Sequence, residues 1–180
     1  MTLDLKTSIA TINHSIKLTS GFVLPSYDLK YETYGNLNQD KSNAVLICHA
    51  LSGNLHAAGR YDNDDRSGWW DNMIGPGKPI DTNLLFVVCL NNLGGCHGST
   101  GPNTIDKKTG KYFGMNFPGV TVSDWVNTQK YLMDHLKIGK WNFVIGGSLG
   151  GMQSLQWAFQ FPTLVDNCII IAAAPKLSAQ

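Results

Sequence analysis

The chain has 180 residues, of which 43% are hydrophobic and 15% charged, and its formal net charge is +1 at pH 7. This composition is typical of a folded globular protein and argues against a disordered chain. The sequence contains neither a Lys/Arg cluster nor a long apolar run, so we expect no binding to nucleic acid or to membranes. The first residues do not resemble a signal peptide, and we therefore expect a cytoplasmic protein.

The first half of the chain has the pattern of strands separated by loops. Residues 7–18 and 27–34 carry β-type patterning, and the alternation in 27–34 predicts a wet face that holds Lys30 and Glu32. Continuous apolar runs at 44–48 and 84–90 predict strands that are buried on both faces. Long loops follow these two strands, and a loop of such length in a compact domain usually has a function.

The second half alternates helices and strands. Thr121 has the position of a helix N-cap, and apolar residues then recur at helical spacing with Gln129 as the polar exception, so we expect a helix that ends near Gly139. A strand from about 141, a helix over 149–161 and a strand over 165–172 should follow. This order predicts an α/β fold with a mostly parallel sheet, helices on both faces, and functional loops at the carboxyl ends of the strands.

The turn between the predicted strand at 141 and the next helix contains G-x-S-x-G, with Ser148 at its centre. A strand before this motif and a helix after it are the setting in which the serine becomes an exposed nucleophile on a strained turn. Two backbone N–H groups should stabilise an oxyanion there. We assign one to Leu149 and the other to Leu51, with Ala50 as the second choice for the latter.

A serine nucleophile needs a base, and on this fold the acid and the histidine follow the serine in the chain. Only 32 residues follow Ser148, and they contain one acid, Asp166, and no histidine. Asp166 begins a predicted strand and therefore lies at the wrong edge of the sheet. His49 ends a strand near the site and should shape the oxyanion loop, while His56 and His97 are expected to line the pocket. The sequence thus predicts an incomplete triad.

The four cysteines do not form a metal site by spacing. Cys48, Cys89 and Cys168 lie in apolar runs and are expected to be reduced core residues. A zinc site built from Cys48, Cys96 and the nearby histidines matches no compact ligand pattern. We therefore expect no metal.

With these residues in view, the chain resembles the homoserine O-acetyltransferase family of acyltransferases, which have the α/β-hydrolase fold. The likeness covers nearly all 180 residues. It is carried by several motifs in one order: His49-Ala50-Leu51-Ser52-Gly53, Gly68-Trp69-Trp70, Ile74-Gly75-Pro76-Gly77-Lys78, Asn92-Leu93-Gly94-Gly95-Cys96, Gly98-Ser99-Thr100-Gly101-Pro102 and Gly146-Gly147-Ser148-Leu149-Gly150-Gly151-Met152-Gln153. Ser52 replaces the threonine that is commoner in the family.

The resemblance implies a two-step transfer in methionine synthesis, in which Ser148 takes an acetyl group from acetyl-CoA and passes it to the hydroxyl of L-homoserine. It implies no cofactor, with acetyl-CoA as co-substrate, and a homodimer in full-length members. The residues expected to contact substrate are His49, Ala50, Trp70, Asn92 and Gly94. Family members are roughly twice as long and continue into a helical lid and two strands that bear the catalytic Asp and His. Residues 1–180 are therefore expected to form one truncated α/β-hydrolase domain without those strands and lid.

Three alternatives remain open at this stage. In the first alternative, the chemistry is the same but the donor is succinyl-CoA or the acceptor is serine. Residues far downstream would decide the donor and the acceptor. In the second alternative, the protein is a plain esterase of the same fold. Transfer of the acyl group to homoserine in preference to water would exclude it. The chain is a catalytically inactive N-terminal fragment, as the missing Asp and His suggest.

Overall fold

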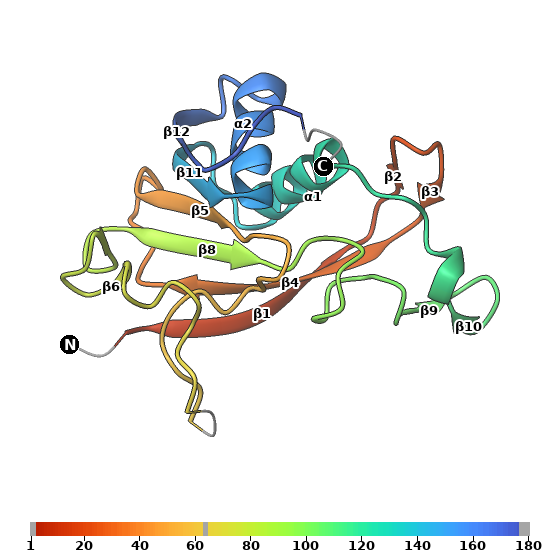
Figure 1. Ribbon diagram of the computed structural model, residues 1–180, viewed down its shortest axis with the longest axis horizontal. Coiled ribbons are helices and arrows are strands. Elements are labelled where there is room, and N and C mark those ends of the chain that lie inside the picture. Colours follow the sequence, from red (N-terminus) through yellow and green to blue (C-terminus); the bar gives the residue numbers. More distant parts are fainter. Residues whose placement is uncertain (1–2, 63–64, 177–180) are drawn as a thin grey trace.

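A six-stranded sheet forms the centre of the computed structural model, which describes residues 3–62 and 65–176 (Figure 1). The expected extent of 1–180 therefore runs past the described residues at both ends. In spatial order the strands are β1 (Leu5–Ile12), β4 (Tyr27–Tyr34), β8 (Phe86–Leu90), β5 (Ala44–Cys48), β11 (Trp141–Gly147) and β12 (Val165–Ile171). β1 and β4 run antiparallel to their neighbours, and the other pairs are parallel. The predicted α/β fold with an antiparallel start is confirmed.

Two helices, α1 (Val122–His135) and α2 (Leu149–Gln160), connect the strands of the second half. Thr121 caps α1 through a capping box with Asp124, as the sequence predicts. The helix ends at His135, slightly before the expected Gly139, because Lys137 adopts a φ of 56°, in the left-handed region.

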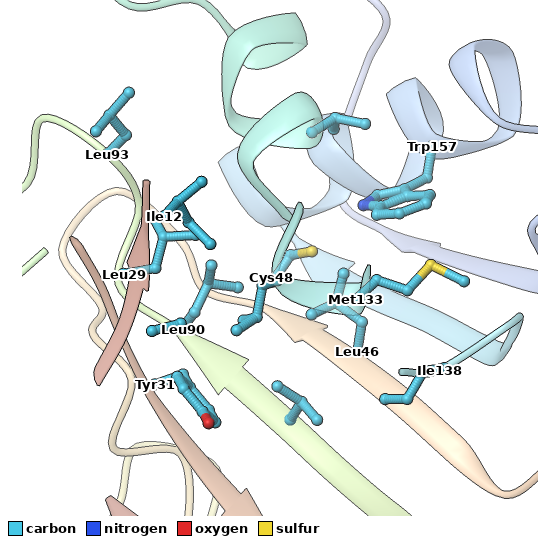
Figure 2. Close-up of a cluster of buried hydrophobic side chains, with 14 of the residues drawn as sticks. Ile12, Leu29, Tyr31, Leu46, Cys48, Leu90, Leu93, Met133, Ile138 and Trp157 are labelled. Atoms are coloured by element: carbon cyan, nitrogen blue, oxygen red, sulfur yellow. The ribbon is translucent and has the colours of Figure 1, made fainter. Parts of the chain in front are cut away.

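Both helices lie on the same face of the sheet. They cover a cluster in which Met133 of α1 and Trp157 of α2 pack over Leu46, Cys48 and side chains of β4 and β8 (Figure 2). The opposite face is covered by a second cluster that includes Ala57, Ala58, Ile74 and Ile80.

The prediction of helices on both faces is therefore wrong for the described residues. The reason lies in the crossover from β5 to β8, which would have to supply a helix for the second face. In its described residues that crossover is a long loop with only two short paired strands, β6 (Ile74–Gly75) and β7 (Ile80–Asp81). Small and apolar residues of this loop cover the sheet instead.

The stretch from 91 to 120, expected to be a loop, contains some regular structure. β9 (Ile105–Asp106) pairs with β10 (Lys111–Tyr112), and the 3-10 helix η1 (Gly114–Asn116) follows. Near the N-terminus, β2 (Ile16–Lys17) pairs in the same way with β3 (Val23–Leu24). No helix in the described part of the chain is both long enough and apolar enough to cross a bilayer.

Candidate active site

Ser148 occupies the sharp turn between β11 and α2, at the carboxyl end of the parallel strands. Its backbone has φ 54° and ψ −123°, a conformation that costs a residue with a side chain about 1–3 kcal/mol. The turn is held by a hydrogen bond from the Ser148 N–H to the carbonyl of Ile171 at 3.0 Å. Ser148 itself is exposed. The strained, exposed serine that the motif predicts is therefore present in the structure.

Two glycines of the motif are required because backbones meet closely at this turn. A Cβ on Gly146 would lie 2.2 Å from the backbone of Gly150, and a Cβ on Gly150 would lie 2.0 Å from the carbonyl oxygen of Cys48. Neither contact is sterically possible, so only glycine fits at these two positions. The start of α2 is thus pressed directly against the end of β5, where the loop with Leu51 begins.

That loop, residues 49–53, is held through the carbonyl of Ala50. This oxygen accepts hydrogen bonds from the Gly53 N–H at 3.0 Å and from Nδ1 of His49 at 2.7 Å. Because a trans peptide is planar, fixing the Ala50 carbonyl also fixes the Leu51 N–H, which points the opposite way. The Leu149 N–H is in the first turn of α2, where helical N–H groups have no intrahelical partner. Both N–H groups assigned to the oxyanion hole are therefore held in defined orientations.

His49 takes part in this arrangement as a neutral ring. Burial lowers its pKa below the usual value, only partly opposed by the hydrogen bond with Ala50, and nearby His97 lowers it further. In the neutral ring Nδ1 is the protonated nitrogen, since it faces a carbonyl oxygen, and Nε2 is a buried acceptor without a partner among the described residues. This geometry matches the expectation that His49 shapes the loop.

Two cavities meet at this loop. The first has a volume of about 700 Å³ and is lined by Ser148, Leu149 and Leu51 together with apolar side chains of Met152 and Ala172–Ala174. The second has a volume of about 270 Å³ and shares Leu51 with the first. Its lining includes the polar side chains of His49, Asn92 and His97.

The five residues expected to contact substrate are not all in one place. His49 and Asn92 line the smaller cavity, and Ala50 lies in the loop 49–53, where its carbonyl accepts from the Gly53 N–H. Gly94 is a turn position with φ 85°, and its N–H donates to the Thr100 carbonyl; its neighbour Gly95 lines the cavity instead. Trp70 packs against the cluster on the opposite face of the sheet and lines neither cavity.

The histidines and acids near the site have partners other than Ser148. His49 bonds to Ala50, His56 to Glu32, and His97 lies against Cys96. Asp166 forms an exposed ion pair with Lys140 at the amino end of β12, as expected for a strand-entry residue. The described residues thus bring Ser148 together with two oriented N–H groups, while no histidine is hydrogen-bonded to Ser148 within them.

The structure contains two buried polar clusters that the sequence patterns do not predict. Gln129 and Gln153 hydrogen-bond to each other beneath the elbow, and Glu32 is fully buried although the alternation in 27–34 predicts a wet face for it. The burial of Gln129 is indicated by the sequence, because it is the polar residue in an otherwise apolar helical pattern. The burial of Glu32 is not indicated, because the loop that covers it comes from far along the chain.

The cysteines are free, and Cys48 and Cys89 are buried, as expected for reduced core residues, whereas Cys168 is only half-buried. Burial raises the pKa of the Cys48 and Cys89 thiols. No group of three or more His, Cys, Asp or Glu side chains that could hold a metal ion occurs in residues 3–62 and 65–176.

Comparison with known proteins agrees with this geometry. Residues 43–180 match the family model described as "alpha/beta hydrolase fold", which covers more than half of the chain. The chain belongs to the α/β-hydrolase family.

Particular relatives narrow the likeness. The homoserine O-succinyltransferase of Pseudomonas syringae pv. tomato is 64% identical over 172 residues, which are 95% of this chain and 45% of that protein. The crystal structure of a homoserine O-acetyltransferase from Bacillus anthracis superposes with a TM-score of 0.91 at 38% identity, over 97% of this chain and 48% of the other. Esterase E22, as its L374D mutant, gives the same TM-score and identity, over 97% and 49% of the two chains.

These comparisons confirm the resemblance to homoserine acyltransferases that the motifs predict. The chain spans about half the length of the curated relatives it matches. The acyl group in the names of these relatives differs, succinyl for the Pseudomonas syringae protein and acetyl for the Bacillus anthracis protein, so the expectation of acetyl-CoA as donor stays a prediction.

Proposed function

We propose that this chain carries the nucleophile and the oxyanion hole of a homoserine O-acyltransferase, with Ser148 as nucleophile and the N–H groups of Leu149 and Leu51 as donors. The observation that carries the proposal is the strained Ser148, which opens into a cavity of about 700 Å³ beside the loop that holds Leu51. The 64% identity to a homoserine O-succinyltransferase supports homoserine as the acyl acceptor.

In the first step, Ser148 Oγ attacks the carbonyl carbon of an acyl-CoA thioester. A C–O bond forms, the C–S bond breaks, and the serine proton ends on the CoA thiol. In the second step, the side-chain hydroxyl of homoserine attacks the acyl-serine, O-acylhomoserine leaves, and a proton returns to Ser148. The tetrahedral intermediate of each step carries an oxyanion that the two N–H groups stabilise.

Both steps need a base that moves the proton. In full-length members of the family, as the resemblance implies, this base and its acid lie C-terminal to the region that this chain matches. Apolar walls around Ser148, formed by Met152 and the alanines at 172–174, would keep water from the acyl-enzyme.

The name of the 64% identical relative supports succinyl-CoA as the donor. Acetyl-CoA is the second candidate, supported by the Bacillus anthracis structure. A plain esterase is the third, because esterase E22 is as similar in structure as the acetyltransferase is.

Thiol release from succinyl-CoA and from acetyl-CoA, with and without L-homoserine, tests the proposal. One arm uses the chain alone, and the other uses the chain joined to the C-terminal part of the Pseudomonas syringae relative. Ser148→Ala is the control in both arms. We expect homoserine-dependent release in the joined protein, faster with succinyl-CoA, and loss of this release in Ser148→Ala.

The outcomes separate the candidates. Release that does not require homoserine, together with hydrolysis of simple esters, would favour the esterase. Thiol release that is as fast with serine as with homoserine would indicate that serine is the acceptor. Activity in the joined protein but none in the chain alone would identify residues 1–180 as a portion that lacks the base. No Ser148-dependent acylation in either arm would overturn the proposal.

A further inference from the structure

A single buried side chain, Gln153, touches both backbone segments that form the proposed oxyanion hole. It lies on the second turn of α2 and is fully buried. Its Nε2 lies 3.4 Å from the carbonyl oxygen of Leu149 and 3.5 Å from that of His49. The first carbonyl belongs to the turn that starts at Ser148, and the second belongs to the loop that leads to Leu51.

These two contacts are long for hydrogen bonds, so their importance depends on burial. An amide N–H that is removed from water and has no acceptor costs free energy, which holds the amide near the two carbonyls. Within the described residues, Nε2 of Gln153 has no other acceptor. The low local dielectric further strengthens whatever polar contact is made there.

The opposite end of the Gln153 amide is held much more tightly. Its Oε1 accepts a hydrogen bond from Nε2 of Gln129 at 2.5 Å. Gln129 is in turn oriented by Nε1 of Trp157, which donates to Gln129 Oε1 at 2.7 Å. A further contact at 3.4 Å joins Gln129 Nε2 to Oδ1 of Asn92, in the loop after β8. Helix α1 therefore fixes which way the Gln153 amide faces.

We propose that Gln153 is a positioning residue that sets the spacing and orientation of the oxyanion-hole donors. The carbonyl of His49 shares its planar peptide with the Ala50 N–H, so holding this carbonyl fixes the plane that precedes Leu51. The plane that follows is already held by the His49 ring and the Gly53 N–H, both at the Ala50 carbonyl. Gln153 thus couples the Leu51 loop to the first turn of α2.

This inference rests on the proposed function, since it matters only if an oxyanion forms at Ser148. Its test compares two reactions of one nucleophile in a Ser148→Cys chain. Attack of the thiolate on a thioester passes through a tetrahedral oxyanion, whereas alkylation by iodoacetamide is a direct displacement without one. A thiolate also reacts without the base that serine requires. Peptide mapping by mass spectrometry distinguishes this thiol from the exposed Cys96.

The acylation rate with succinyl-CoA and with acetyl-CoA, divided by the alkylation rate, reports on the oxyanion hole alone. Gln153→Met on the Ser148→Cys background should lower this ratio about tenfold, less than the ~100-fold or greater loss caused by deleting one oxyanion donor. Alkylation should stay within about twofold. Gln156→Met is the matched control, since Gln156 lies on the same helix and among the described residues its side chain bonds to Gln160, and the ratio should not change.

If Gln153→Met does not fold, Gln129→Met decides the question, because it removes the donor that orients Gln153; the ratio should then fall by a smaller factor in the same direction. A folded Gln153→Met chain with an unchanged ratio would overturn the inference and leave the proposed function in place. Equal losses of acylation and alkylation would also overturn it, since they indicate general distortion. A parent Ser148→Cys chain that is acylated no faster than free cysteine would overturn the proposed function itself, and this inference with it.

Discussion

Two buried polar clusters lie on opposite faces of the sheet and differ in kind. The Glu32 cluster, on the face without helices, surrounds one carboxylate with donors from Thr7, Tyr34, His56 and Tyr61. The glutamine cluster, on the helical face, consists of neutral groups from Asn92, Gln129, Gln153 and Trp157.

Because of this difference in charge, we expect the Glu32 cluster to contribute mainly to folding stability and the glutamine cluster to contribute also to the reaction at Ser148. A buried carboxylate must be fully compensated, and its donors here tie the loop at 55–61 to strands β1 and β4. A neutral carboxamide has both donors and acceptors, so Gln153 can hold two carbonyls without placing a charge beside a developing oxyanion. We therefore expect changes in the first cluster to reduce mainly folding stability, and changes in the second to reduce acylation as well.

The largest effect is expected from Glu32→Ala. Removing the carboxylate leaves several donors buried without an acceptor, so the free energy of unfolding should fall by about 3–5 kcal/mol. Chemical denaturation followed by circular dichroism measures this. The control is Asp4→Ala, because Asp4 forms an exposed pair with Lys6 at 3.2 Å and should change stability by less than about 0.5 kcal/mol. A loss below 1 kcal/mol for Glu32→Ala would show that the Glu32 cluster is not a main source of stability.

Gln129→Met tests the second cluster by the same measurement. The indole N–H of Trp157 and the amide oxygen of Gln153 both lose their partner, and the free energy of unfolding should fall by about 1–3 kcal/mol. On the Ser148→Cys background, the folded fraction of Gln129→Met should also be acylated more slowly by acyl-CoA, unlike the folded fraction of Glu32→Ala. If both variants slow acylation equally, the division between the two clusters is wrong.

The two clusters also explain what could be predicted from the sequence. The elbow at Ser148 is local: a buried strand, glycines that permit close backbone contact, and a helix start are all adjacent in the chain, and the structure contains each of them. Gln129 was visible as a break in helical periodicity, but its partner Gln153 was not, since their contact depends on how two helices pack.

The burial of Glu32 could not be predicted from the sequence for a related reason. Alternation of polar and apolar residues predicts one wet face, yet it cannot reveal that a loop 24 residues further along places His56 against that face. The same loop covers the face of the sheet on which helices were also expected, and Trp70 packs against the cluster on that face, away from the cavity. The periodicity of a single strand does not indicate whether an irregular segment from elsewhere in the chain covers one of its faces.

A smaller effect is expected at the elbow itself. The conformation of Ser148 is unfavourable for any residue with a Cβ, so Ser148→Gly should be more stable than Ser148→Ala by about 1 kcal/mol. Both variants lack the hydroxyl, which makes Ala the matched reference, and thermal unfolding of the pair measures the difference. Equal stability of the two would mean that the strain at the elbow is relieved elsewhere. The comparison thereby separates the strain of the backbone from any contribution of the serine hydroxyl.

The smallest expected effect is a pH dependence that belongs to the oxyanion loop. Burial lowers the pKa of His49 in the folded state, so between this value and the ordinary pKa of about 6.5 the unfolded chain binds more protons. Stability should therefore fall as the pH drops below about 6.5, and part of this fall should be absent in His49→Gln. Denaturation of both chains between pH 7.5 and 5.5 measures it; the advantage of the parent chain over the variant should shrink toward the acidic end.

His97→Gln is the control for that experiment, because His97 is exposed and contributes to the lowered pKa of His49 only through its charge. It should retain most of the pH dependence. A pH profile of His49→Gln that is parallel to the parent's would mean that folding does not lower the pKa of His49. The ring whose Nδ1–H holds the Ala50 carbonyl would then become charged below the ordinary pKa of about 6.5. Below that pH a positive charge beside the loop 49–53 would replace the uncharged support that distinguishes this face of the sheet from the Glu32 cluster.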